Sequence, residues 1–466
     1  MSRTIPDRRV KRVLVIAYVF PPAGGAGVQR ISKFVRYLPE CGWDCSVLTV
    51  ANPSVPVFDE SLLAEIPDST IVRRTRTYEP GYAMKSLVAA SSKAKPLRFS
   101  LKRIVKNTIR AAGNAVLQPD AQILWYPRAV REGRRLLEEL HHDAIFVTAP
   151  PFSSLLIGAS LSRSSGLPLV VDYRDEWGIS NRYQENRQKS ALSHLVQERM
   201  QRRVLRQAKA VIATTRRSAD SLKERVQNCG SHATVSHIYN GYDRADLQCG
   251  PESASPKPTN DRYRIAYVGT FWNLTDISPL VRGIRELAAR RPDLAAKLEL
   301  IVAGRRTGEQ EAVLDQLSDL PCLLTRKGYL SHSEAIEVMR SSNELALLLS
   351  DVPESSRVMP AKTFEYLALN RNILAVSPPG EMTELLASCP LAESFLPGDT
   401  TGIARHLERR LAEQSWAPTE SAWESSRFER RHLTGQLANV LSFAAGSSGG
   451  TDARKFNPFE ILGTNR

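Results

Sequence analysis

The chain has 466 residues, of which 42% are hydrophobic and 24% charged, and its formal net charge is +14. This length exceeds what one hydrophobic core serves, so we expect two or three domains of an ordinary globular protein. The six cysteines form no CxxC pair and no metal-ligand spacing with histidine, which argues against a zinc site and a disulfide framework and favours a reducing cytosol. No segment approaches the ~18–20 consecutive apolar residues that a membrane-spanning helix needs, so we do not expect this protein to be an integral membrane protein.

The first apolar segment, VLVIAYVF at residues 13–20, follows the basic sequence RRVKR. The two together imitate a secretory signal peptide. Eight apolar residues are at the short limit for such a signal, however, and similar β-branched runs recur along the chain. We therefore interpret the segment as a strand.

A glycine-rich loop follows, in the sequence AYVFPPAGGAGVQR at residues 17–30. Pro21 and Pro22 cannot donate in a strand ladder and should end the strand. The three glycines that follow are Gly24, Gly25 and Gly27. They allow close ligand approach, and a helix beginning near Ala26 would leave amides suited to an anion. The loop lacks the GxGxxG and P-loop patterns, so an ordinary tight turn remains the alternative.

The net positive charge gathers between Glu79 and Asp120, where eight basic residues and no acidic ones occur. Within residues 97–116, apolar side chains recur at helical spacing. Four basic side chains, spaced four residues apart, lie on the opposite side of the same helix. The four are Arg98, Lys102, Lys106 and Arg110. We predict a basic amphipathic helix that either packs on its own domain or attaches to an anionic membrane surface. Nucleic acid is not an expected partner, because the segment has few aromatic residues.

Strand-like apolar runs alternate with helical patterns, for instance at 131–140, 153–164 and 190–207. This alternation predicts parallel strands joined by crossover helices in a doubly wound α/β sheet. We assign residues 1–246 to this first Rossmann-like domain. The Pro- and Ser-rich residues 247–262 are interpreted as a linker.

The alternation then restarts and predicts a second doubly wound domain at residues 263–423, with helices at 276–290, 309–317 and 331–341. Ser331 and Glu334 have the spacing of a capping box at the start of the last of these helices. A helix at 424–445 is expected to cross back to the first domain. Residues 446–466 have too little apolar content to fold alone and are expected to be a disordered tail.

The segment PAKTFEYLALNRNILAV, residues 360–376, is the most informative one in the second half. Pro360 suits a first helical turn, which would place Lys362 and Thr363 at free amides and at the positive end of the helix dipole. Lys362 could bind a diphosphate there, and Glu365 could accept hydrogen bonds from a ribose. The alternative is a solvated Lys–Glu pair on an ordinary helix.

Six segments occur in an order and spacing that resemble the family-four nucleotide-sugar glycosyltransferases, which retain anomeric configuration. They are AYVFPPAGGAGVQR, TAPPFSSLLIG, VVDYRDEW, IYNGYD, IAYVGTF and PAKTFEYLALNRNILAV. The resemblance covers about residues 10–440. It implies the GT-B architecture, in which two Rossmann-like domains face each other across a cleft.

The resemblance also implies the site residues and the partners. The donor-binding residues that it implies are Gly24, Gly25, Gly269, Thr270, Arg305, Lys362, Thr363 and Glu365. Arg174 and Asp175 correspond to a polar pair that the family presents to the reacting sugar, although an internal salt bridge in VVDYRDEW is the alternative. The donor would be a nucleoside diphosphate sugar and the acceptor a saccharide or lipid-linked saccharide. No cofactor or metal is expected, and the location would be the cytoplasm, peripheral at the inner face of the plasma membrane.

Three departures from the family pattern stand beside these similarities. Arg357 replaces a glutamate that contacts the donor sugar in many relatives, and Leu155 replaces a frequent histidine. The basic pair that usually follows Gly269 is missing, so Arg305 or Arg306 would substitute for it. A homologue that binds a nucleotide sugar or a partner without turnover therefore remains an alternative, as does a nucleotide-sugar epimerase of similar architecture.

Overall fold

The computed structural model describes residues 10–82, 117–183, 190–248, 262–271, 274–413, 416 and 423–446. The predicted basic helix at 97–116, the predicted linker from residue 249 and the predicted tail from residue 447 lie outside these ranges. The chain divides into two compact units, Met1–Tyr239 with Arg430–Arg466, and Asn240–Glu429.

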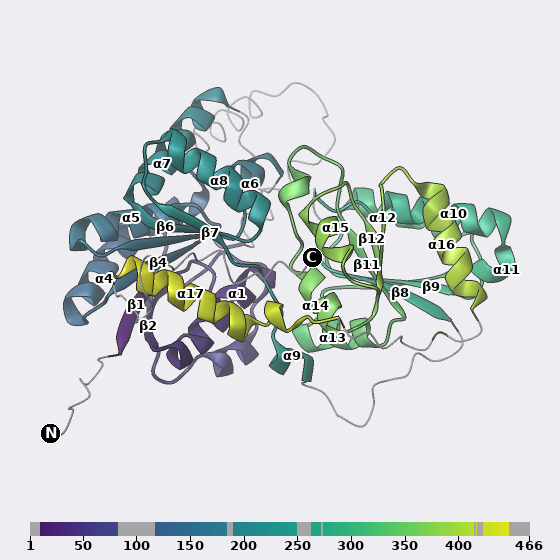
Figure 1. Ribbon diagram of the computed structural model, residues 1–466, viewed down its shortest axis with the longest axis horizontal. Coiled ribbons are helices and arrows are strands. Elements are labelled where there is room, and N and C mark those ends of the chain that lie inside the picture. The colour runs from purple at the N-terminus through teal and green to yellow at the C-terminus, as the bar shows by residue number, and fades with distance from the viewer. Residues whose placement is uncertain are drawn as a thin grey trace. The chain divides into compact units, whose positions relative to one another are not determined.

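The first unit is built on a seven-stranded sheet with the order β3-β2-β1-β4-β5-β6-β7, in which every neighbouring pair is parallel. Its strands are β1 (Lys11–Ile16), β2 (Trp43–Val50), β3 (Ile71–Thr75), β4 (Ala144–Ala149), β5 (Leu169–Tyr173), β6 (Ala208–Ala213) and β7 (Thr234–His237). The central strands are apolar on both faces because helices cover both (Figure 1). Leu14 and Ile16 face one apolar cluster, and Val13 and Val15 face the other.

Helices cover the two faces of this sheet in separate groups. They are α1 (Ala26–Tyr37), α4 (Tyr126–Glu139), α5 (Ser153–Ser165), α6 (Trp177–Tyr183), α7 (Ala191–Gln207), α8 (Arg216–Asn228) and α17 (Arg430–Ala444). Helices α4, α5, α7 and α8 share one apolar cluster with the sheet. Helices α1 and α17 share the cluster on the opposite face, so the last described helix completes the core of the first unit.

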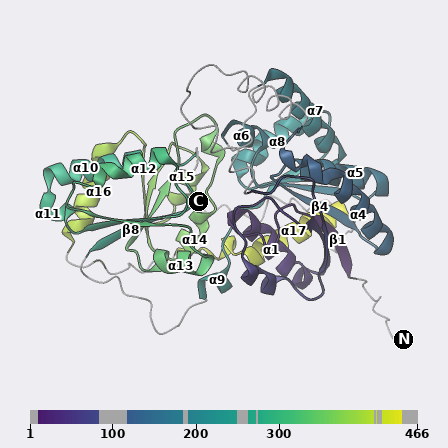
Figure 2. The ribbon, with the colours of Figure 1, turned by 180° about the vertical axis from the view of Figure 1, so that it is seen from behind.

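The second unit has a six-stranded, fully parallel sheet with the order β10-β9-β8-β11-β12-β13. Its strands are β8 (Tyr263–Val268), β9 (Leu298–Ala303), β10 (Leu323–Lys327), β11 (Glu344–Leu348), β12 (Asn372–Val376) and β13 (Ala392–Phe395). The two doubly wound sheets confirm the predicted fold class. Figure 2 shows helices on both faces of each sheet from behind.

The helices of the second unit are mostly short. They are α9 (Arg244–Gln248), α10 (Ser278–Arg290), α11 (Pro292–Ala295), α12 (Gly308–Leu314), α13 (His332–Arg340), α14 (Lys362–Ala368), α15 (Glu381–Leu386) and α16 (Thr400–Ala412). The capping box predicted at Ser331 and Glu334 is confirmed at the start of α13. Among the described helices, none combines the length and the apolar composition needed to cross a bilayer.

Candidate functional site

The strand order of the first unit reverses between β1 and β4, which are neighbours although β2 and β3 lie between them in the chain. Ligands of open parallel sheets bind beyond the carboxyl ends of the strands at such a switch point. The glycine loop after β1, the loop after β4 and the loop after β5 all begin at this edge. The edge is therefore the candidate site of the first unit.

Two of the three glycines in the glycine loop have a separate structural reason. Gly25 has a φ of +95° and precedes α1, so it supplies a backbone conformation that other residues rarely adopt. Gly24 lies close to Val57: its amide donates to the Val57 carbonyl at 3.0 Å, and an added Cβ would lie 3.0 Å from Cγ1. Helix α1 begins at Ala26, as predicted, with no side-chain cap and no acidic residue in its first turn. Its positive end is therefore not neutralised by its own first-turn side chains.

The arginine that closes the glycine stretch makes a buried ion pair. Arg30 Nη2 lies 2.9 Å from Asp172 Oδ1, and Arg30 Nε donates to Asp172 Oδ2 at 3.2 Å. Thr148 Oγ1 donates to the same carboxylate at 2.8 Å, and Arg30 Nη1 donates to the Tyr239 carbonyl at 2.7 Å. This pair ties α1 to the ends of β4 and β5, and it joins Asp172 of VVDYRDEW to a residue outside that segment.

Arg174 follows β5 and binds backbone carbonyls. Its guanidinium donates to the carbonyls of Gly27 and Pro150, and its Nε reaches the Ala149 carbonyl at 3.5 Å. Burial lowers the pKa of Arg174, while the nearby carboxylates Asp175 and Asp172 act in the opposite direction. Arg174 thus fixes the loops after β1 and β4 in place, which is a positioning role, and Asp175 lies half-buried beside it.

In the second unit, the ends of β8 and β9 meet through two glycines. Gly269 donates its amide to the Ala303 carbonyl at 2.9 Å. Gly304 has a φ of +125°, and a Cβ added there would lie 2.1 Å from the Gly269 carbonyl oxygen. Only a glycine fits at this approach. The sequence AGRR indicates a loop after β9 but does not reveal the role of Gly304. Its contact with Gly269, 35 positions earlier in the chain, follows from the strand order, which the local sequence does not show.

The two arginines after Gly304 differ in their contacts. Arg306 donates through Nε to Glu311 Oε1 at 2.6 Å and through Nη1 to the Lys327 and Gly304 carbonyls at 2.6 and 3.0 Å. These bonds give Arg306 a structural role. Arg305 has an exposed side chain, so it is the better candidate of the two for contact with a ligand.

Helix α14 begins at Lys362, and the turn before it starts at Pro360. Lys362 Nζ lies 2.5 Å from Glu365 Oε2, so the two residues predicted for the diphosphate and the ribose form one ion pair. The expectation of a free amide at Thr363 is wrong, because this amide donates to the Pro360 carbonyl at 3.0 Å. The Thr363 side chain is fully buried, and its Oγ1 has no hydrogen-bond partner among the described residues.

The two residues that depart from the family pattern are both accommodated by the fold. Arg357 Nη2 lies 3.1 Å from Glu354 Oε1, in the turn before α14. Leu155 is fully buried on α5, in the apolar cluster of the first unit. Both side chains are therefore held by contacts within their own unit.

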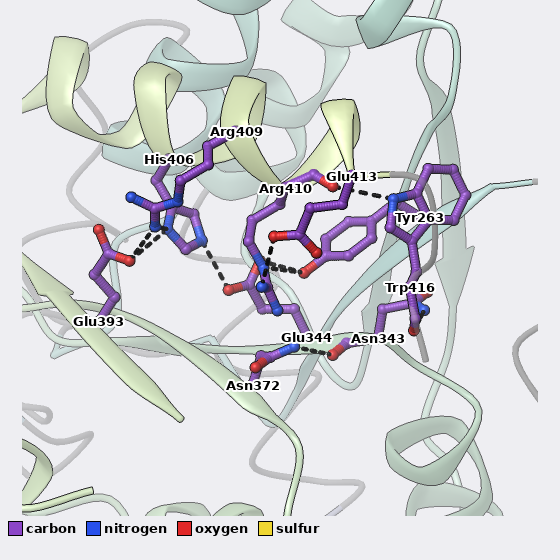
Figure 3. Close-up of polar contacts among 10 residues, drawn as sticks. All are labelled: Tyr263, Asn343, Glu344, Asn372, Glu393, His406, Arg409, Arg410, Glu413 and Trp416. Atoms are coloured by element: carbon purple, nitrogen blue, oxygen red, sulfur yellow. Dashed lines mark hydrogen bonds and ion pairs between the residues drawn. The ribbon is translucent and has the colours of Figure 1, made fainter. Parts of the chain in front are cut away.

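A second polar cluster lies at the opposite edge of the second sheet (Figure 3). Tyr263, Glu344 and Asn372 begin β8, β11 and β12, so they lie at the amino ends of these strands. Glu344 accepts a hydrogen bond from His406 Nε2 at 2.8 Å. Because ligands bind at the carboxyl ends, this cluster is separate from the candidate site. Within the described ranges, His, Cys, Asp and Glu form no group of three that could hold a metal.

The glycine contact gives a prediction for the second unit. Replacing Gly304 with alanine should destabilise that unit by about 1–3 kcal/mol, because the Cβ meets a backbone oxygen and the φ is unfavourable. Urea unfolding measured on the variant and on Gly308→Ala would check this, since nothing lies within 4 Å of a Cβ at Gly308. Equal stability of the two variants would contradict the close approach.

Comparison with known proteins identifies one domain. Residues 24–241, just under half of the chain, match the family model described as glycosyl transferase 4-like domain. No curated protein matches the chain with significant sequence similarity.

Several solved structures share the fold of the whole described chain. Anabaena HepE in complex with UDP and glucose has a TM-score of 0.59 at 16% identity, over 93% of this chain and 100% of that one. Sucrose-phosphate synthase from Thermosynechococcus elongatus has a TM-score of 0.55 at 15% identity, over 93% and 96%. A candidate UDP-N-acetylglucosamine 2-epimerase from Listeria monocytogenes has a TM-score of 0.52 at 11% identity, over 92% and 95%. These similarities show the GT-B fold with its two Rossmann-like domains.

Proposed function

We propose that the chain is a glycosyltransferase that transfers a sugar from a nucleoside diphosphate sugar. Residues 24–241 match the model of the glycosyl transferase 4-like domain, and the chain has the GT-B fold. The acceptor in this proposal is a saccharide or a lipid-linked saccharide, and the anomeric configuration is retained. The biological context would be cell-envelope or exopolysaccharide synthesis. The family match of the first unit is the observation that carries the proposal.

Donor binding is proposed for the second unit, at the carboxyl edge of its sheet. Lys362 would bind the diphosphate and Glu365 the ribose, and their ion pair of 2.5 Å already holds both side chains beside each other. The remaining proposed donor contacts are Gly269, Thr270, Arg305 and Thr363. HepE is described with UDP, so uridine diphosphate sugars are the first donors to test.

The chemical step breaks the bond between the anomeric carbon and the diphosphate and forms one to the acceptor oxygen. The departing diphosphate gains negative charge, so a fixed Lys362 ammonium would stabilise the transition state more than the ground state. The acceptor hydroxyl loses its proton in the same reaction, and an oxygen of the departing diphosphate takes it up. We propose that the first unit contributes Gly24, Gly25, Arg174 and Asp175 to the reacting sugar and the donor.

Replacement of Lys362 with alanine should lower turnover about 100-fold, because a charged contact to the leaving group is lost. The matched control is Lys297→Ala: Lys297 is exposed and precedes β9, at the amino edge of the same sheet. Steady-state transfer of radiolabelled sugar from its donor would measure both variants. Unchanged turnover in Lys362→Ala would remove this residue from the site.

Two alternatives follow from specific observations. Arg357 and Leu155, which are held in structural contacts, favour a homologue that binds a nucleotide sugar without turnover. The chain shares its fold with the candidate epimerase, so nucleotide-sugar epimerisation is the second alternative function. A mass-spectrometric screen of donors with cell-envelope extracts separates the three, since transfer gives a heavier acceptor, epimerisation an isomeric donor, and binding alone no product.

We further propose that the protein works in the cytoplasm and associates peripherally with the inner face of the plasma membrane. The support is the basic pattern of residues 97–116. Changing Arg98, Lys102 and Lys106 to glutamate should weaken flotation with anionic vesicles. Binding that is indifferent both to this change and to the anionic lipid would oppose this proposal.

A further inference from the structure

Helices α5 and α7 enclose a groove that is lined almost entirely by arginine. Its volume is about 450 Å³, and its lining residues are Arg163, Arg199, Arg202, Arg203, Arg206 and Gln207. All five arginines are exposed. Figure 1 shows α5 and α7 among the helices on one face of the first sheet. Because its arginines are exposed, the groove opens to solvent.

The charge of this arginine groove is not neutralised within the described part of the chain, where no carboxylate lies within ion-pair distance of its arginines. Arg206 Nε donates to a backbone carbonyl, that of Cys229, at 2.8 Å. The one acidic residue of α7, Glu198, lies 3.0 Å from Arg225 Nη1 on α8. Five like charges side by side repel one another, so the groove should favour an anionic partner.

The face of α7 that carries these arginines also carries two exposed leucines. Leu192 is 67% exposed and Leu195 is 51% exposed. At 100° per residue, these leucines and the four arginines of α7 fall within one arc of about 100°. The opposite arc carries the residues that α7 buries, which are Ser193, Gln197, Gln201, Val204 and Leu205. The exposed stripe therefore changes from apolar to basic along a single helix face.

We propose that this stripe, Leu192, Leu195 and the arginine groove, docks the first unit on an anionic phospholipid surface. Arginines would bind headgroup phosphates, and the two leucines would enter the boundary between the headgroups and the acyl chains. The two leucines distinguish a membrane from nucleic acid as the partner. Leucine side chains contribute to binding a bilayer, whereas binding to a nucleic acid backbone depends on charge. The proposal rests on the membrane association proposed above and deepens it by adding a second contact surface to residues 97–116.

The test is flotation of the full-length protein with neutral phosphatidylcholine vesicles and with vesicles that contain 30% phosphatidylglycerol. We expect binding to the anionic vesicles alone, weakened at least 10-fold by Arg199→Glu with Arg202→Glu. The matched control is Arg131→Glu with Arg134→Glu, which places the same charge change at the same spacing on exposed positions of α4. The control should bind like the wild type, and thermal unfolding of each variant confirms that it folds.

A second variant and a competitor separate the outcomes. Leu192→Ala with Leu195→Ala keeps every charge and should weaken flotation several-fold. Inorganic phosphate should not displace the protein from vesicles when added at the same ionic strength as chloride. The proposal is wrong if the arginine variant floats with anionic vesicles as the wild type does, or if the α4 control loses as much vesicle binding as the arginine variant. It is also wrong if the protein binds an oligonucleotide and the leucine change does not alter vesicle flotation. UDP binding and donor turnover measured without vesicles report on the proposed glycosyl transfer independently, so failure here leaves that proposal intact.

Discussion

Replacing Asp172 with asparagine should destabilise the first unit by about 3–5 kcal/mol, since it leaves the Arg30 charge buried without its partner. The Arg30 and Asp172 side chains are only 4% and 1% exposed, so water cannot take over the lost interaction. Asparagine keeps the volume of aspartate and still offers one oxygen to Thr148. The expected loss is therefore electrostatic and does not include a cavity.

Amide exchange in β5 measures this effect within the first unit, which matters because two units need not unfold together. Exchange of the most protected amides should speed up by at least about 100-fold in Asp172→Asn. The matched control is Asp44→Asn, which breaks the pair of Arg12 and Asp44. That pair is 3.0 Å long, and its side chains are 26% and 28% exposed. It should cost less than about 1 kcal/mol. Equal exchange in the two variants would contradict a buried charge pair.

The regular elements of this chain could be predicted because their signals are local. The strand segments VLVI of β1 and AIFVTA of β4 are buried at every position and apolar at all but Thr148, which is typical of parallel strands covered on both faces. Strand β1 ends at Ile16, four residues before Phe20, where the prolines were expected to end it. The helix predicted at 190–207 is found at Ala191–Gln207. The short edge strand β13 and helix α16 were not predicted. The sequence of β13, AESF, is short and only partly buried, so neither its length nor its pattern indicates a strand.

Only those site residues that stand in a recognisable motif could be predicted from the sequence. The contacts between them could not. The ion pair of Arg30 and Asp172 joins residues 142 positions apart, and Gly269 approaches Gly304 across two strand ends. Contacts of this kind depend on strand order, which periodicity does not reveal. For the same reason the hydrogen bonds of the Arg174 guanidinium to the Gly27 and Pro150 carbonyls could not be predicted from the sequence.

The stability of the second unit should fall as the pH rises through the pKa of His406. This side chain lies between two carboxylates, with Nε2 2.8 Å from Glu344 Oε1 and Nδ1 2.9 Å from Glu393 Oε2 (Figure 3). Burial alone would lower the pKa of His406, but the two carboxylates outweigh it and raise the pKa above its ordinary value of 6.5. Arg409 also donates to Glu393 from the same helix. The imidazolium form thus holds β11 and β13 to α16.

The direction of the pH effect follows from linkage. Because the folded pKa of His406 is raised, its contribution is fully present below pH 6.5 and is lost as the pH rises through the folded value. Burial raises the pKa of Glu393, but His406 and Arg409 lower it overall from 4.5, so its contribution is present above pH 4.5 and is lost on further acidification. Denaturant unfolding followed by amide exchange in β11 should therefore show greatest stability of this unit between about pH 4.5 and 6.5.

Changing His406 to leucine should remove the decline above pH 6.5 and cost about 3–5 kcal/mol at pH 6, because Glu344 is 1% exposed and loses its charged partner. Adding Glu344→Leu should recover part of that loss, since no buried charge then remains unpaired. The control is His332→Leu, whose partner Asp246 lies 3.2 Å away in a more exposed pair. It should cost less than about 1 kcal/mol and leave the pH dependence of β11 unchanged. If the stability of His406→Leu still falls above pH 6.5 as in the wild type, another group titrates there. If the double variant is less stable than His406→Leu, groups other than this imidazole stabilise Glu344.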